Sequence, residues 1–113
     1  PIIQGDTDML YQAFLHIFIN AMQAMPDGGE IAVWAKSANN SLWIAVEDHG
    51  SGISQEAMEK IWDPFFTTKD KGTGLGLGIV KNIIEAHEGQ VRIDNRPEGG
   101  ARVSLRLPII KEE

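Results

Sequence analysis

The sequence predicts an α+β fold, a two-layer sandwich in which three helices cover one face of a mainly antiparallel, five-stranded sheet. Two patterns predict it. Residues 6–25 and 72–87 carry apolar side chains at helical spacing, and each of these segments is followed by a pair of strand-like segments. Apolar and polar residues alternate, as in half-buried strands, in residues 30–36, 42–48, 90–94 and 102–108. This order of one helix and two strands, repeated, favours antiparallel pairs with the helices on one side.

The composition fits one globular domain, since 42% of the 113 residues are hydrophobic and 23% are charged. The absence of cysteine excludes disulfides and thiolate metal sites and fits a reducing compartment. The formal net charge of −6 argues against a nucleic-acid surface, and no stretch approaches the ~20 apolar residues of a membrane span. We therefore expect a domain that contacts neither nucleic acid nor membrane. We also expect it to be monomeric in isolation and cytoplasmic, in a full-length protein for which a membrane anchor stays open.

The first half of the chain predicts an edge strand, a long helix and a hairpin. Residues 1–5 are short and apolar enough for the edge strand, and Asp6 can cap the helix that follows. Turn residues at 26–29 end this helix. Residues 37–41 are expected to turn the chain between two hairpin strands, with Trp34 and Trp43 close together on the face opposite the core.

The second half predicts two helices and a second pair of strands. Ser54 can cap a short helix that runs to about Ile61. A longer helix begins in a glycine-rich run and ends at Glu88 and Gly89. Residues 97–100 then turn the chain between the last two strands.

The glycine-rich run, Gly72-Thr-Gly-Leu-Gly-Leu-Gly78, leads directly into this longer helix. Glycines let a ligand approach the backbone, and a helix N-terminus with unpaired N–H groups binds phosphate readily. There is no Gly-Lys-Ser/Thr for a P-loop, and no register matches G-x-G-x-x-G. The run therefore predicts a polyphosphate site of another kind, although a flexible loop that only caps a core helix is the plainer alternative.

Two further polar features are candidates for a site. Asp48 shares the apolar face of its strand, so this carboxylate points toward the core at a strand end and requires donors there. His16, Asn20 and Gln23 share one face of the first helix, beside its apolar face. Such a row is usually only solvated, so the row by itself does not indicate a site.

Four segments together resemble the catalytic ATP-binding domain of sensor histidine kinases, in the Bergerat-fold ATPase superfamily. The resemblance covers about residues 6–108, and its motifs are specific because all four occur in order and at the family's spacing. They are the N box Phe14-Leu-His-Ile-Phe-Ile-Asn-Ala21, the first glycine box Asp48-His-Gly-Ser-Gly52, the F box Pro64-Phe-Phe66 and the second glycine box 72–78.

The resemblance implies which residues would bind the adenine of ATP and which residue would bind a metal ion. Asp48 would accept the adenine amino group, while Gly50, Gly52 and Ile53 would lie against the purine. Asn20 would hold Mg²⁺ through its side-chain oxygen, which suits a hard cation. The ion would bridge the phosphates of ATP, and ADP would occupy the same site.

The resemblance also implies which residues would bind the phosphates of ATP, and a lid formed by about residues 54–74. Phe65 would anchor the lid, and Lys69 is a candidate phosphate contact and catalytic residue, although a solvated loop lysine is equally plausible. The phosphates would contact the second glycine box and the helix start, namely Gly72, Thr73, Gly74, Leu75, Gly76 and Leu77. We expect residues 67–76 to be ordered by nucleotide.

The chain departs from the family at three positions: the family usually has Asn at His16, often a basic residue at Gln23, and more commonly Ser or Ala at Gly78. His16 lies one turn before Asn20. We expect it to act near the phosphates, through a bound water or as a hydrogen-bond donor, with packing at the helix edge as the alternative.

No histidine in this sequence lies in the family's phosphoacceptor context. The resemblance therefore implies transfer of the γ-phosphoryl group to a histidine on a separate helical dimerisation domain, in two-component signalling with a response regulator. One alternative is an ATPase or serine kinase of the same superfamily; those ATPases tend to carry Glu at position 16 and to lack the F box. Another is a nucleotide-binding or partner-docking module without catalysis.

Overall fold

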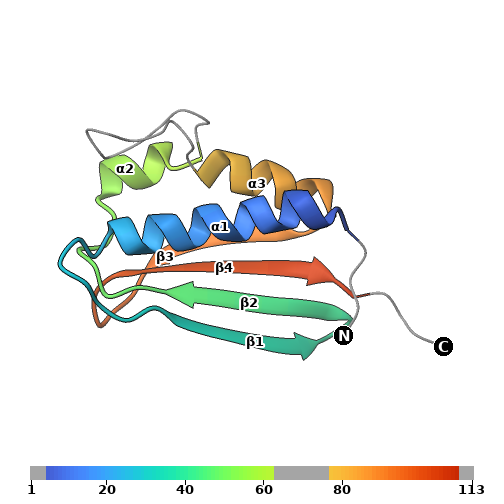
Figure 1. The fold of residues 1–113 in the computed structure, drawn as a ribbon, viewed down its shortest axis with the longest axis horizontal. Helices are drawn as coiled ribbons and strands as arrows, with labels where there is room; N and C mark the ends of the chain where they lie inside the picture. Colours follow the sequence, from blue (N-terminus) through green and yellow to red (C-terminus); the bar gives the residue numbers. More distant parts are fainter. Residues whose placement is uncertain (1–4, 63–76, 110–113) are drawn as a thin grey trace.

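Seven helices and strands follow the predicted order in the computed structural model, which describes residues 5–62 and 77–109 (Figure 1). Each begins and ends close to the predicted positions. In chain order they are α1 (Thr7–Gln23), β1 (Ala32–Ala38), β2 (Ser41–Glu47), α2 (Gln55–Lys60), α3 (Leu77–Ala86), β3 (Gln90–Asn95) and β4 (Ala101–Pro108).

The sheet is antiparallel, with the strand order β1-β2-β4-β3. Val46 of the inner strand β2 lies opposite both Val33 of β1 and Val103 of β4, so the inward-facing residues form continuous rows across the sheet. Figure 1 shows the helices on one face of this sheet, which confirms the predicted α+β sandwich.

The prediction of five strands is corrected, because the described residues form four. The fifth strand is the one predicted at residues 1–5, of which 1–4 lie outside the described residues. A short apolar stretch beside a helix cap has no alternation long enough to identify a strand, so the sequence could not establish this element.

The core lies between α1 and α3 on one side and the central strands on the other. Ile17 of α1 and Ile84 of α3 are almost completely buried, and so are Leu105 and Leu107 of β4. Full burial of such a side chain stabilises the fold by roughly 1.5–3 kcal/mol. The packing fixes α1 and α3 side by side, so that the last turns of α1 and the beginning of α3 line a common cavity.

Local hydrogen bonds set the ends of the helices. Asp6 caps α1 by accepting from the N–H of Met9 at 3.0 Å, and Ser54 caps α2 by accepting from the N–H of Ala57 at 3.1 Å. At the far end of α3, His87 Nε2 accepts from the N–H of Asp6 at 2.9 Å. This bond ties the beginning of α1 to the end of α3.

The hairpin between β1 and β2 is tighter than predicted. Asn39 and Asn40 alone form the turn, both with positive φ (52° and 60°), so β1 continues to Ala38 instead of ending before residue 37. Asparagine tolerates this left-handed conformation, which allows a two-residue turn.

Within the described ranges, no helix combines the length and apolar character needed to cross a bilayer.

Candidate functional site

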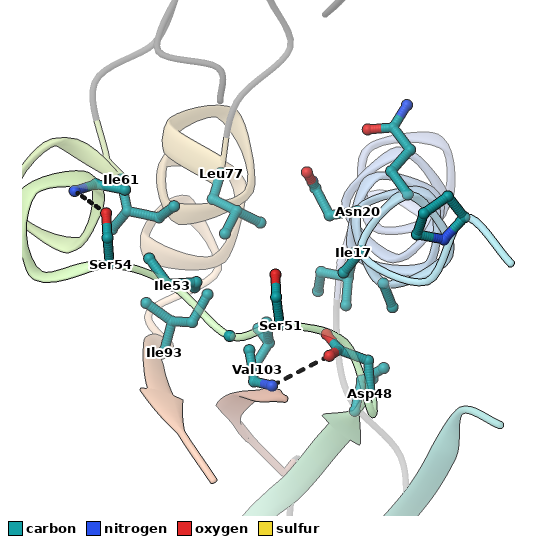
Figure 2. Close-up of a pocket in the computed structure, with 18 residues that line it drawn as sticks. Ile17, Asn20, Asp48, Ser51, Ile53, Ser54, Ile61, Leu77, Ile93 and Val103 are labelled. Atoms are coloured by element: carbon teal, nitrogen blue, oxygen red, sulfur yellow. Dashed lines mark hydrogen bonds between the residues drawn. The ribbon is translucent and has the colours of Figure 1, made fainter. Parts of the chain in front are cut away.

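A cavity of about 700 Å³ opens between the helical layer and one end of the sheet (Figure 2). Residues from α1, α2, the start of α3 and the loop after β2 line it. The volume lies within the range of small-molecule sites. Its inner wall is apolar, formed by Ile17, Ala21, Val46, Ile93 and Val103.

Asp48 supplies a carboxylate to this apolar end of the cavity. It directly follows β2 and is buried, with 7% of its surface exposed. Its Oδ1 atom accepts two backbone hydrogen bonds, from Gly50 at 2.9 Å and from Ala101 at 3.1 Å. The N–H of Asp48 in turn donates to the Ala101 carbonyl at 3.0 Å. Because both bonds use Oδ1, the Oδ2 atom is the oxygen that remains to accept from a ligand.

The glycine loop, residues 48–53, reaches the cavity because two of its residues carry no side chain. A Cβ at Gly50 would come within 2.4 Å of the Ala24 carbonyl oxygen at the end of α1. Gly52 has φ +81°, a conformation that residues with side chains rarely adopt. These glycines let the backbone turn sharply after Asp48, so Gly52 and Ile53 line the cavity.

Asn20 faces the cavity from α1. Its Nδ2 donates to the His16 carbonyl at 2.9 Å, one turn earlier in the helix. The side-chain oxygen is therefore the atom left for a ligand, and Figure 2 shows it pointing away from α1 toward the side of the cavity where Leu77 begins α3. The described residues contain no group of three or more His, Cys, Asp or Glu side chains that could hold a metal ion by themselves.

The structure brings together five of the predicted site residues in the cavity lining: Asn20, Asp48, Gly52, Ile53 and Leu77. Gly50 contributes through its bond to Asp48 and is not part of the lining. Other predicted residues lie outside the described residues, namely Phe65, Lys69, Gly72, Thr73, Gly74, Leu75 and Gly76.

His16 is buried on α1 and is not among the described residues that line the cavity. Its Nδ1 atom is buried and finds no hydrogen-bond partner among the described residues. An unpaired buried polar atom costs about 1–3 kcal/mol. The expected role of His16 near the phosphates stays a prediction, because the structure does not place its side chain in the cavity lining. Gln23, the other departure from the family pattern on this helix, does line the cavity.

Sequence reasoning missed several residues that complete the cavity. Ser51, Ala57 and Ile61 line it, and the N–H of Ala101 holds Asp48. The bond from Ala101 had no sequence signal, because it depends on the pairing of β2 with β4 across 53 positions.

A model of one protein family, described as "Histidine kinase-, DNA gyrase B-, and HSP90-like ATPase", matches residues 5–111 of this chain. The chain belongs to this family. The recognised resemblance and the fold assignment are therefore confirmed.

Within the family, the chain is similar to sensor histidine kinases. It is 45% identical over 109 residues to the signal transduction histidine-protein kinase AtoS of Escherichia coli (strain K12), covering 95% of this chain and 18% of AtoS. The solved catalytic domain of the histidine kinase ThkA superposes with a TM-score of 0.84 at 34% identity, over 94% of this chain and 70% of ThkA's. Full-length ShkA, solved in complex with AMPPNP, superposes with a TM-score of 0.78 at 27% identity, over 92% of this chain and 22% of ShkA's. The chain spans about a fifth of the length of the curated relatives it matches.

Proposed function

We propose that this domain binds Mg²⁺-ATP in the cavity and transfers the γ-phosphoryl group to a histidine of a separate helical dimerisation domain. The observation that carries the proposal is Asp48, a buried carboxylate with one oxygen fixed by two N–H bonds and the other available at the apolar end of the cavity. Bound AMPPNP, an ATP analogue, in the similar protein ShkA supports the same ligand class here.

The end of the proposed site at Asp48 selects adenine through the hydrogen-bond acceptor and the apolar surface that it presents. Oδ2 of Asp48 is an acceptor only, which suits the exocyclic amino group of adenine and not the carbonyl oxygen of guanine. Ile53 and Ile93 provide apolar surface for the ring. A site built to accept one hydrogen bond rejects a ligand that presents another acceptor, because two acceptors are then left facing each other.

The phosphate end is assigned to Asn20 and the beginning of α3. Leu77, the first residue of α3, lines the cavity, and the unpaired N–H groups of a helix N-terminus favour phosphate. Asn20 offers a single neutral oxygen, so it fits Mg²⁺ only together with phosphate oxygens and waters, the usual environment of this ion. When bound, Mg²⁺ would neutralise charge on the phosphates. The chain itself carries a net charge of −6, and local groups must therefore offset the phosphates.

The proposed reaction is an in-line displacement at the γ-phosphorus. A ring nitrogen of the acceptor histidine forms the new P–N bond while the bond to the bridging oxygen breaks, and ADP leaves with that oxygen. This chain contributes binding and orientation, which account for most of the catalysis in phosphoryl transfer. A response regulator would then receive the phosphoryl group, and the domain would work in the cytoplasm.

Transfer to a separately prepared dimerisation domain tests the proposal. The domain is incubated with γ-labelled ATP and Mg²⁺, with and without a histidine kinase dimerisation domain. We expect no label on the domain alone and label on the added domain. Acid-labile label on His16, His49 or His87 would contradict this assignment of the acceptor. Binding of ATP without any transfer would favour the alternative of a nucleotide-binding module without catalysis.

A further inference from the structure

A segment outside the predicted motifs holds the glycine loop in place. It consists of the last residue of β3, Asn95, and the turn Arg96–Gly100 that leads into β4. Its partner in the glycine loop, Ile53, lies 42 positions away in the sequence, at the rim of the cavity.

Asn95 pairs with one residue of the glycine loop through both ends of its amide. Oδ1 accepts from the N–H of Ile53 at 2.7 Å, and Nδ2 donates to the carbonyl of the same residue at 2.7 Å. An amide side chain used this way presents the donor and acceptor that a neighbouring strand would offer. The contact is also close to Gly52, where a Cβ would lie 2.9 Å from Asn95 Oδ1.

The turn that follows Asn95 is itself fixed to the beginning of the glycine loop. Arg96, whose side chain is 11% exposed, donates through Nη1 to the carbonyl of Asp48 at 2.9 Å. Its Nε lies 3.6 Å from Glu47 Oε2, and the N–H of Arg96 donates to the Gly100 carbonyl at 2.8 Å. The segment at 95–100 thus holds the loop at both of its ends, Asp48 and Ile53.

We propose that Asn95 is a positioning residue for nucleotide binding, an inference that rests on the proposed function. By pairing with Ile53 before the ligand arrives, it keeps the loop backbone in the geometry that the purine requires. Residues that are ordered in advance lose less conformational freedom on binding, so the affinity is higher. Because Asn95 holds the purine end of the site, its effect is the same for ATP and ADP.

Replacement of Asn95 by alanine tests the proposal, with calorimetric titration of ADP and ATP. Asn95→Ala removes two hydrogen bonds from an exposed side chain without altering the core, so the variant is expected to fold. We expect Kd for both nucleotides to rise about tenfold, because binding must then also order the loop that Asn95 holds in the parent. The matched control is Asp94→Ala, at the adjacent position, whose carboxylate pairs with the exposed Arg92 at 3.6 Å; its Kd should not change.

A second variant, Asn95→Asp, distinguishes the loss of hydrogen bonding to Ile53 from the loss of side-chain volume. Aspartate has the same shape and still accepts from the N–H of Ile53, but its second oxygen faces the Ile53 carbonyl and repels it. We expect affinity as low as in Asn95→Ala, together with faster hydrogen exchange at the Ile53 amide in both variants. Without nucleotide both variants should still unfold cooperatively, because neither disturbs the core, while the lost hydrogen bonds lower the melting temperature by several degrees.

The outcomes are distinguishable. Parent-like Kd in Asn95→Ala, or in Asn95→Asp, would overturn the positioning role, and so would unchanged exchange at Ile53. A larger loss for ATP than for ADP would also contradict it, because the effect would then lie at the phosphate end. Failure of the unmodified domain to bind either nucleotide would overturn the proposed function, whatever the variants do.

Discussion

His16 is one of three buried polar side chains in the part of the chain that the structure describes, with Ser41 and Asp48. Asp48 accepts two hydrogen bonds and Ser41 Oγ accepts one from Arg106 at 3.2 Å, whereas His16 Nδ1 has no partner within the described ranges. It lies one turn before Asn20 on α1, although it does not line the cavity. We therefore retain the hypothesis that this ring acts through a water or as a donor to phosphate.

Two substitutions of His16 test this hypothesis. Asparagine can still donate, so His16→Asn should retain Mg²⁺-dependent ATP affinity and transfer rate. His16→Ala should lower the transfer rate roughly 10- to 100-fold, the range for a hydrogen bond to a charged group. Single-turnover transfer measures both. If both variants transfer at the parent rate, the histidine is only part of the packing between the helices.

The β1–β2 hairpin is the element whose details the sequence predicted only in part. Trp34 and Trp43 lie on the face opposite the helices, half exposed, as the alternation predicted. The register places Trp34 opposite Ala45 and Trp43 opposite Lys36, so the tryptophans are diagonal neighbours and not a direct pair. At this separation long aromatic side chains still reach each other.

A double-mutant cycle on Trp34 and Trp43, each replaced by alanine, measures this contact. We expect a coupling of about 0.5–1.5 kcal/mol in the free energy of unfolding. The cycle of Trp34 with Trp62, which follows α2 on the helical side of the sheet, is the control and should show no coupling. Additive effects at Trp34 and Trp43 would rule out an aromatic pair.

The two-residue turn of the same hairpin leads to a second prediction, about the stability of variants at Asn40. Asn40 has φ +60°, which costs an alanine about 1–2 kcal/mol. Asn40→Ala should lower the free energy of unfolding by about 1 kcal/mol, whereas Asn40→Gly, which adopts this φ freely, should not share that strain. The measurement is urea unfolding. Equal stability of the alanine variant and the parent would contradict the turn conformation.

At the scale of the whole molecule, the sequence predicted the two layers and five of the residues that line the cavity. Helical spacing and strand alternation identified α1, α3 and the four strands, because their burial on one face requires these periods. Because side chains alternate between the two faces of a strand, the sequence also placed Asp48 on the core-facing side at the end of β2. Asn95 and Arg96 could not be found this way, because their roles depend on where the β3–β4 turn meets a loop more than forty positions earlier.

The same limit applies to the donors that orient Asp48. One comes from Gly50, only two positions along the chain. The other comes from Ala101, which meets Asp48 only because β4 pairs with β2. Local pattern therefore predicts that the carboxylate needs donors, and the sheet topology decides which residues provide them.

The central claim, that this cavity holds the adenine of ATP against Asp48, is tested most directly by calorimetric titration of Asp48→Asn with ATP and ADP. The new amide oxygen can still accept from Gly50 and Ala101, so the fold is expected to persist, while the amide nitrogen presents donors where adenine requires an acceptor. The account predicts that both nucleotides lose about 2–4 kcal/mol of binding free energy, and that the control Asp94→Asn loses none. Parent-like affinity of Asp48→Asn for ATP and ADP would contradict it.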